Sequence, residues 1–300
     1  MIRLIFFLLI VLVSSQVSAQ EKPVLPLPAP PPDTVSIQSD AVTKAILANS
    51  STGHIMWHDV KNGWYDLGQY VTRPLHWDAR EWAIIGTGIA FTSMLQLVDD
   101  IPIRNLVQNN RGATADQFVN FGNNFYGNGY ATALTTISLY SIGLATDNNK
   151  LRTMGLHVLE SFAYSGLTTS LLKIIIGRNR PFLGNGRFSY GNFSLQDALN
   201  SMPSGHVTVA AALSESLAAD IDNTYVSILL YSFVAATAYS RMYSDVHWLS
   251  DTFLAGVIGT CSAFWVTHQP DHYDLKTNDP KPTSFEIVPS LTGLSLAYHF

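Results

Sequence analysis

Residues 201–221 read SMPSGHVTVAAALSESLAADI, a short polar turn that leads into an apolar run of helical length. The run ends at the DIDN sequence of residues 220–223, whose polar residues are typical helix-stop signals. Comparable apolar runs recur on both sides of this segment. The sequence therefore predicts helices at Trp82–Val98, Tyr130–Thr146, Thr153–Ile176, His206–Ile221, Tyr225–Tyr243 and Trp248–Thr267. Together they predict an all-α fold, a bundle of six helices.

Polar segments separate the predicted helices and are expected to lie outside them. They are DDIPIRN at 99–105, NFGNNFYGNGY at 120–130, DNNK at 147–150 and GRNRPFLGNGRFSYGNFS at 177–194. At the C-terminus, residues 285–291 and 292–300 include apolar side chains that alternate with smaller or polar ones, which predicts a short β-hairpin. The Trp, Tyr and His residues between Ala41 and Trp82 fit amphipathic helices lying against a core or a membrane interface, and equally fit ordinary packing.

The N-terminal sequence has the features of an export signal. Arg3 precedes an apolar run and small residues follow it, which predicts a signal peptide at 1–19; an uncleaved anchor is the alternative, but the run is short for a membrane span. Residues 20–40 are rich in proline and are predicted to be a spacer. A helical domain at 41–275 and a tail at 276–300 would follow. We expect an exported protein of the cell envelope, periplasmic and membrane-associated.

Composition limits the classes of function. The chain has 300 residues, 47% hydrophobic and 13% charged, so it can bury a sizeable core. Its net charge of -5 argues against nucleic acid as a partner, because a nucleic-acid-binding surface clusters Lys and Arg. The predicted helices approach the minimum length of a membrane span, yet they carry ionisable groups such as Glu160 and Lys173 that are costly in lipid. Membrane-associated helices and a soluble periplasmic bundle both stay open.

Three segments carry residues of chemical interest, and the first is KIIIGRNRP at 173–181. Lys173 stands near the end of an apolar run, and Arg178 and Arg180 stand in the loop beyond it. Cations are thereby concentrated at one place in an acidic protein, so any phosphate-binding site is expected to be local. Taken alone, arginines in a loop are usually solvated.

The second segment is PSGH at 203–206, directly before a predicted helix. Amides at the N-terminus of a helix are unpaired and favour an anion, so Ser204 and Gly205 can hold one with His206 at its edge. Taken alone, a Ser-Gly pair before a helix is usually only a cap.

The third segment is YSRMYSDVHWLSD at 239–251, which contains Ser240, Arg241, His247 and Asp251. His247 and Asp251 are four residues apart, which on a helix places them on one face. A carboxylate bonded to one imidazole nitrogen fixes the tautomer and leaves the other nitrogen as a nucleophile or base. Although a single histidine is more often structural, the three segments together supply the positioning and the charge neutralisation that phosphoryl transfer needs.

The three segments resemble the three-part motif of the type 2 phosphatidic acid phosphatase superfamily. The matching residues are Lys173 with Arg180 and Pro181, then Pro203, Ser204, Gly205 and His206, then Ser240, Arg241, His247 and Asp251. They match in order and spacing, with no substitution at a motif position, over roughly residues 173–251. The resemblance implies the helical bundle that this superfamily shares with vanadium haloperoxidases. Arg178 lies outside the motif and is expected in a substrate loop or on the surface.

The resemblance also implies a mechanism. His247, oriented by Asp251, would attack phosphorus and form a phosphohistidine, and His206 would act first as acid and then as base. The groups that would bind the phosphate oxygens are Lys173, Arg180, Ser204, the Gly205 amide and Arg241. Because cations take the part that metal ions have in many phosphatases, no metal and no other cofactor is implied.

The implied function is hydrolysis of a phosphomonoester or diphosphate, with a phosphorylated lipid or a small phosphoester as the substrate. Two alternatives remain at the level of sequence. A vanadium-dependent haloperoxidase would use the same residues to hold vanadate, and a non-catalytic envelope protein could retain the same fold. The identity of the phosphoester and the oligomeric state do not follow from the sequence.

Overall fold

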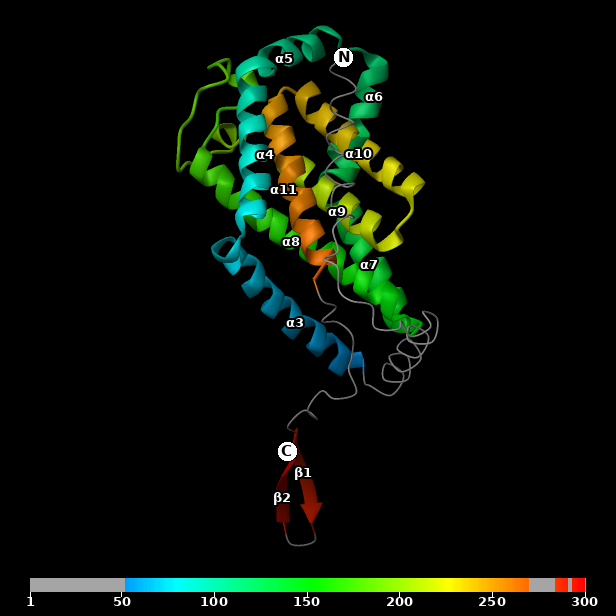
Figure 1. Ribbon diagram of the computed structural model, residues 1–300. Coiled ribbons are helices and arrows are strands. Elements are labelled where there is room, and N and C mark those ends of the chain that lie inside the picture. Colours follow the sequence, from blue (N-terminus) through cyan, green and yellow to red (C-terminus); the bar gives the residue numbers. More distant parts are fainter. Residues whose placement is uncertain (1–51, 270–283, 291–292, 300) are drawn as a thin grey trace, which may run out of the picture. The chain divides into compact units, whose positions relative to one another are not determined.

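The computed structural model describes residues 52–269, 284–290 and 293–299. In these residues it has nine α-helices and a two-stranded sheet (Figure 1). The helices are α3 Thr52–Thr72, α4 Ala79–Val98, α5 Asp100–Asn109, α6 Ala113–Phe121, α7 Tyr130–Ala145, α8 Asn149–Ile176, α9 Gly205–Ile221, α10 Thr224–Tyr243 and α11 Leu249–Thr267. The strands β1 Ser284–Ser290 and β2 Gly293–His299 pair antiparallel.

The predicted all-α class is confirmed. The six predicted helices correspond to α4 and to α7 through α11, and β1 and β2 form the predicted hairpin. The predicted number of helices is wrong, because α3, α5 and α6 are present in addition. The predicted signal peptide at 1–19 and spacer at 20–40 lie outside the described residues, and the division of the chain into domains stays a prediction.

Two segments that were expected to be breaks are helical. Asp100 begins α5, and Pro102 lies in its first turn, where the missing amide costs little because the first amides of a helix have no carbonyl partner. Residues Gly122–Tyr126 form η2, a single π-helical turn that continues α6. The Asp, Pro and Gly residues of these segments therefore mark a helix start and a π turn instead of loops.

Helix α9 lies at the centre of the packing and contacts α8, α10 and α11 (Figure 1). Its buried side chains are mostly small, which lets its neighbours approach closely. A Cβ added to Gly259 of α11 would lie 2.5 Å from the carbonyl oxygen of Thr208 in α9, so no side chain fits there. The Ser204 amide donates to the Asp251 carbonyl at 3.1 Å, which ties the first turns of α9 and α11 together.

Helix α3 is attached to the other helices by polar contacts. Asp59 pairs with the buried guanidinium of Arg152 in α8 and accepts a hydrogen bond of 2.8 Å from Tyr140 in α7. Trp57 and Trp64 are 69% and 70% exposed, so these two aromatic side chains of α3 face outward and do not pack in the core.

Helices α4 and α11 are long and apolar enough to cross a membrane. Only 11% of the apolar window of α4 is buried, whereas half of that of α11 is buried among the other helices. Because core helices of soluble proteins pass the same criteria, these two helices are weak support for a membrane span.

Candidate active site

The predicted site residues come from the ends of four helices. Lys173 lies in the last turn of α8, and Gly205 is the first residue of α9. Arg241 lies in the last turn of α10, and Asp251 lies in the first turn of α11. His247 belongs to the connection between α10 and α11, so the expectation that it shares a helix face with Asp251 is wrong.

These helix ends converge on one site. A Cβ placed on Gly205 would lie 3.8 Å from Cε of Lys173. The positive charges of Lys173 and Arg241 act on both His206 and His247. The two imidazoles therefore share the same cationic surroundings.

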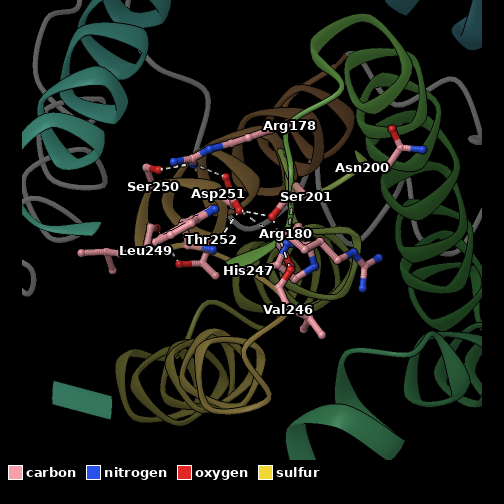
Figure 2. Close-up of polar contacts among 12 residues, drawn as sticks. Arg178, Arg180, Asn200, Ser201, Val246, His247, Leu249, Ser250, Asp251 and Thr252 are labelled. Carbon is pink, nitrogen blue, oxygen red and sulfur yellow. Dashed lines mark hydrogen bonds and ion pairs between the residues drawn. The ribbon is translucent and has the colours of Figure 1, made fainter. Parts of the chain in front are cut away.

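The ring of His247 is oriented by the chain itself (Figure 2). Its Nδ1 lies 2.7 Å from the carbonyl oxygen of Ser201 and 3.7 Å from Oδ2 of Asp251. A carbonyl oxygen only accepts hydrogen bonds, so Nδ1 carries the proton and Nε2 keeps its lone pair. The expected hydrogen bond from His247 to Asp251 is thus replaced by a shorter one to the Ser201 carbonyl.

His247 is only 4% exposed. Burial lowers the pKa of its imidazole to about 3; the charges of Lys173 and Arg241 lower it further, while Asp251 opposes them. The imidazole is therefore neutral at neutral pH, which is the form that a nitrogen nucleophile requires.

Asp251 is fully buried and is fixed from several sides (Figure 2). Its carboxylate accepts hydrogen bonds from Arg178 Nη1 at 2.5 Å, from Ser201 Oγ at 2.5 Å and from the Trp248 amide at 2.8 Å. Because the carbonyl of the same Ser201 bonds His247, Asp251 reaches the imidazole mainly through Ser201.

Arg178 is completely buried, so the expectation of a surface or substrate-loop residue is wrong. Its Nη2 bonds Asp100 Oδ2 at 2.7 Å and its Nη1 bonds Ser250 Oγ at 2.7 Å, in addition to Asp251. The Arg187 carbonyl accepts from its Nε and Nη2 at 3.1 and 2.8 Å. We call Asp100, Arg178, Ser250 and Asp251 the ionic network.

Lys173, Arg180 and Arg241 form what we call the cationic face. Nζ of Lys173 donates to the Asn200 carbonyl at 2.5 Å, and burial lowers the pKa of Lys173 to about 8, assisted by the charge of Arg180. Nη2 of Arg180 bonds the exposed carboxylate of Asp197 at 2.6 Å. Burial also lowers the pKa of Arg241, to about 10.

Several hydrogen-bond donors of the site are left over. Nε of Arg180, Nε of Arg241 and Oγ of Ser204 are buried and have no hydrogen-bond partner within the described ranges. A buried donor without an acceptor costs roughly 1–3 kcal/mol, so such groups usually mark a place where a ligand binds. Two guanidinium groups and a hydroxyl fit a tetrahedral oxyanion.

His206 is half-buried at the same place. Burial lowers the pKa of its imidazole to about 4; the charges of Arg241, Lys173 and Arg180 lower it further, and a hydrogen bond to the backbone of Asn123 opposes them. The free site therefore holds a neutral His206. A bound dianion would offset the three cations and raise the pKa, which would let His206 carry a proton only when substrate is present.

Comparison with known proteins agrees with this geometry. Residues 154–273, from α8 to just beyond α11, match the family model described as the PAP2 superfamily. We refer to residues 154–273 as the PAP2 domain, after the family model that they match. This domain includes every residue of the predicted motif, so the resemblance that the sequence suggested is confirmed.

Relatives of the PAP2 domain include two proteins named lipid A 1-phosphatase, from Rhizobium johnstonii and Rhizobium etli. Each is 40% identical over 67 residues, which is 22% of this chain and 28% or 29% of theirs. The chain thus matches less than a third of the length of these curated relatives. The crystal structure of Aquifex aeolicus LpxE matches 56% of this chain and 93% of its own, with 18% identity and a TM-score of 0.42.

Sequence analysis missed several residues of the site. Ser201 and Arg178 lie inside the PAP2 domain, next to motif residues, and only their burial and contacts identify them. Asp100 and Asn123 lie outside the matched residues, in segments that were expected to be breaks. The one available signal was that these segments are polar within an otherwise apolar part of the chain.

Proposed function

We propose that this protein is a phosphatase that removes phosphate from a phosphorylated lipid through a phosphohistidine on His247. The observation that carries the proposal is the set of buried donors without partners in the described chain, on Arg180, Ser204 and Arg241, beside two neutral imidazoles. An oxyanion satisfies those donors and places its central atom near a nitrogen lone pair.

In the first step, the Nε2 lone pair of His247 forms a bond to phosphorus while the phosphorus–oxygen ester bond breaks. The leaving alkoxide takes a proton from His206, which gains that proton from solvent when the phosphate dianion binds. Lys173, Arg180 and Arg241 stabilise the charge on the other phosphate oxygens. The Ser201 carbonyl holds the proton on Nδ1, and the positive charge that develops on the imidazole lies near Asp251.

In the second step, water attacks phosphorus and gives its proton to His206. The nitrogen–phosphorus bond breaks, inorganic phosphate leaves, and His247 returns to its neutral form. Both steps use groups of this chain alone, and cations perform the charge neutralisation.

A lipid substrate is supported by the segment between Arg180 and Asn200. This segment joins two parts of the site and exposes large apolar side chains, namely Phe182, Phe188, Phe193 and Leu195. Apolar surface beside an anion site suits a molecule with a phosphate head and acyl chains. The named activity of the Rhizobium relatives also agrees, and we place the protein at a membrane of the cell envelope on the same grounds.

The test is phosphate release from phosphatidate, a lipid A phosphate and a soluble aryl phosphate. The His247→Ala variant is compared with His268→Ala, a matched control at the exposed end of α11. We expect His247→Ala to lose at least about a thousandfold in kcat/KM and His268→Ala to retain activity. A labelled phosphoenzyme should be trapped in the wild type and be absent from His247→Ala. Full activity of His247→Ala would refute the mechanism, and halide oxidation with vanadate and peroxide would favour the haloperoxidase alternative.

A further inference from the structure

The π turn η2, residues Gly122–Tyr126, packs closely against α10 through its first residue, Gly122, and through Gly127, which follows it. A Cβ on Gly122 would lie 2.6 Å from Oγ of Ser240, and a Cβ on Gly127 would lie 2.6 Å from Cγ2 of Thr237. Both distances are too short for a side chain. Glycine at 122 and 127 therefore lets the backbone of η2 lie directly on the helix that carries Arg241.

This contact brings Asn123 to Arg241. Oδ1 of Asn123 accepts hydrogen bonds from Nη1 of Arg241 at 2.9 Å and from Oγ of Ser240 at 3.1 Å. Nδ2 of Asn123 donates to Oγ of Ser244 at 2.9 Å, and because a guanidinium only donates, Oδ1 is the end of the amide that faces the arginine. The amide of Asn123 thus accepts two hydrogen bonds and donates one, and it holds one terminal nitrogen of Arg241 while Nε of that arginine stays available.

The same turn also reaches His206. The imidazole of His206 is hydrogen-bonded to the backbone of Asn123, and a Cβ on Gly127 would lie 3.0 Å from Cβ of His206. Asn123 therefore contacts Arg241 with its side chain and His206 with its backbone. π-Helical turns are rare and occur frequently at functional sites.

We propose that Asn123 is a positioning residue of the active site, which orients Arg241 toward the phosphate and sets its place relative to His206. The inference rests on the proposed function, since Arg241 matters only if the site binds phosphate. Oδ1 of Asn123 is taken up by Arg241 and Ser240, and Nδ2 faces Ser244. The side chain of Asn123 therefore acts on the site through Arg241.

The test is a double-mutant cycle of Asn123→Ala and Arg241→Ala, measured as kcat/KM for phosphate release and as the affinity for vanadate. We expect Asn123→Ala to lower kcat/KM about tenfold in the wild type and less than about twofold when Arg241 is already alanine. Asn124→Ala is the matched control, because among the described residues its side chain makes only a long hydrogen bond of 3.5 Å with Asn120, and it should leave both quantities unchanged.

Two outcomes would overturn the inference: full activity of Asn123→Ala, or an equal loss in both backgrounds. If Asn123→Ala does not fold, Ser244→Ala replaces it, since it removes the hydroxyl that accepts from Nδ2 of Asn123, and the same non-additivity with Arg241→Ala is expected. If the wild type releases no phosphate from any substrate, the proposed function fails, and the cycle in vanadate affinity alone then decides whether Asn123 positions Arg241.

Discussion

Arg178 and Arg180 are two residues apart in the chain and have opposite surroundings. Arg178 is completely buried, and its guanidinium nitrogens bond carboxylates, a hydroxyl and a carbonyl of the protein. Arg180 bonds only one exposed carboxylate, that of Asp197, and its buried Nε has no partner among the described residues. A buried arginine whose donors are all satisfied belongs to the scaffold, whereas one with spare donors is built for a ligand.

The same contrast separates the ionic network from the cationic face. In the ionic network two carboxylates lie beside one guanidinium, so each buried carboxylate has a cation next to it. The cationic face gathers three cations with little compensation, and the lowered pKa values of Lys173 and Arg241 record the free-energy cost of keeping them charged there. The ionic network stabilises the fold, whereas the cationic face has a repulsion between like charges that a bound anion relieves.

The largest effect that would sharpen this contrast is the loss of stability in Arg178→Met. Removing this guanidinium leaves the buried carboxylates of Asp100 and Asp251 without a cation, so we expect the free energy of unfolding to fall by about 3–5 kcal/mol. Arg180→Met, the matched control, should change it by less than about 1 kcal/mol because its partner is exposed. Chemical denaturation of both variants measures the difference, and equal losses would contradict the division into two regions.

A smaller effect is expected on the pKa of His206, which is lowered to about 4 by burial and then by Arg241 and its neighbours. Arg241→Gln removes one of these charges, so the pKa should rise by up to about one unit and remain below 6.5 because burial persists. The folded state binds this proton less readily than the unfolded state does, so stability should fall as pH drops from about 6.5 to about 4.

NMR titration of labelled histidine in the wild type and in Arg241→Gln measures this shift. His157, which pairs with Asp220 away from the cationic face, provides an internal reference whose titration should not change. An unchanged pKa of His206 would mean that burial alone sets it and that the cationic face does not act on the acid–base group.

The smallest effect is expected at Asp197. Its exposed carboxylate pairs with Arg180 in the free site and would compete with the phosphate of a substrate for that guanidinium. Asp197→Asn should therefore lower KM about two- to threefold with kcat nearly unchanged, in keeping with the modest strength of exposed ion pairs. Steady-state kinetics at low and moderate salt measure it, with Asp222→Asn at the far end of α9 as control. An increase in KM would indicate that Asp197 positions Arg180 instead of competing for it.

Much of the fold followed from the sequence because apolar runs of helical length leave few alternatives. The runs that became α8 through α11 were bounded by strong stop signals such as DIDN, and their ends were predicted to within a few residues. The segments DDIPIRN and NFGNNFYGNGY were wrongly predicted as breaks, because Asp, Pro and Gly favour helix starts and close packing as well as loops. Local signals could not distinguish these uses.

The sequence by itself determined the all-α class and predicted eight residues of the candidate site, because motif residues and their spacing are local properties of the chain. Tertiary structure alone decided that Ser201 bonds His247, that Arg178 is buried between Asp100 and Asp251, and that Asn123 reaches Arg241. These contacts join residues 46 to 118 positions apart. Only the packing of helix ends against one another brings such residues together, and no local pattern encodes it.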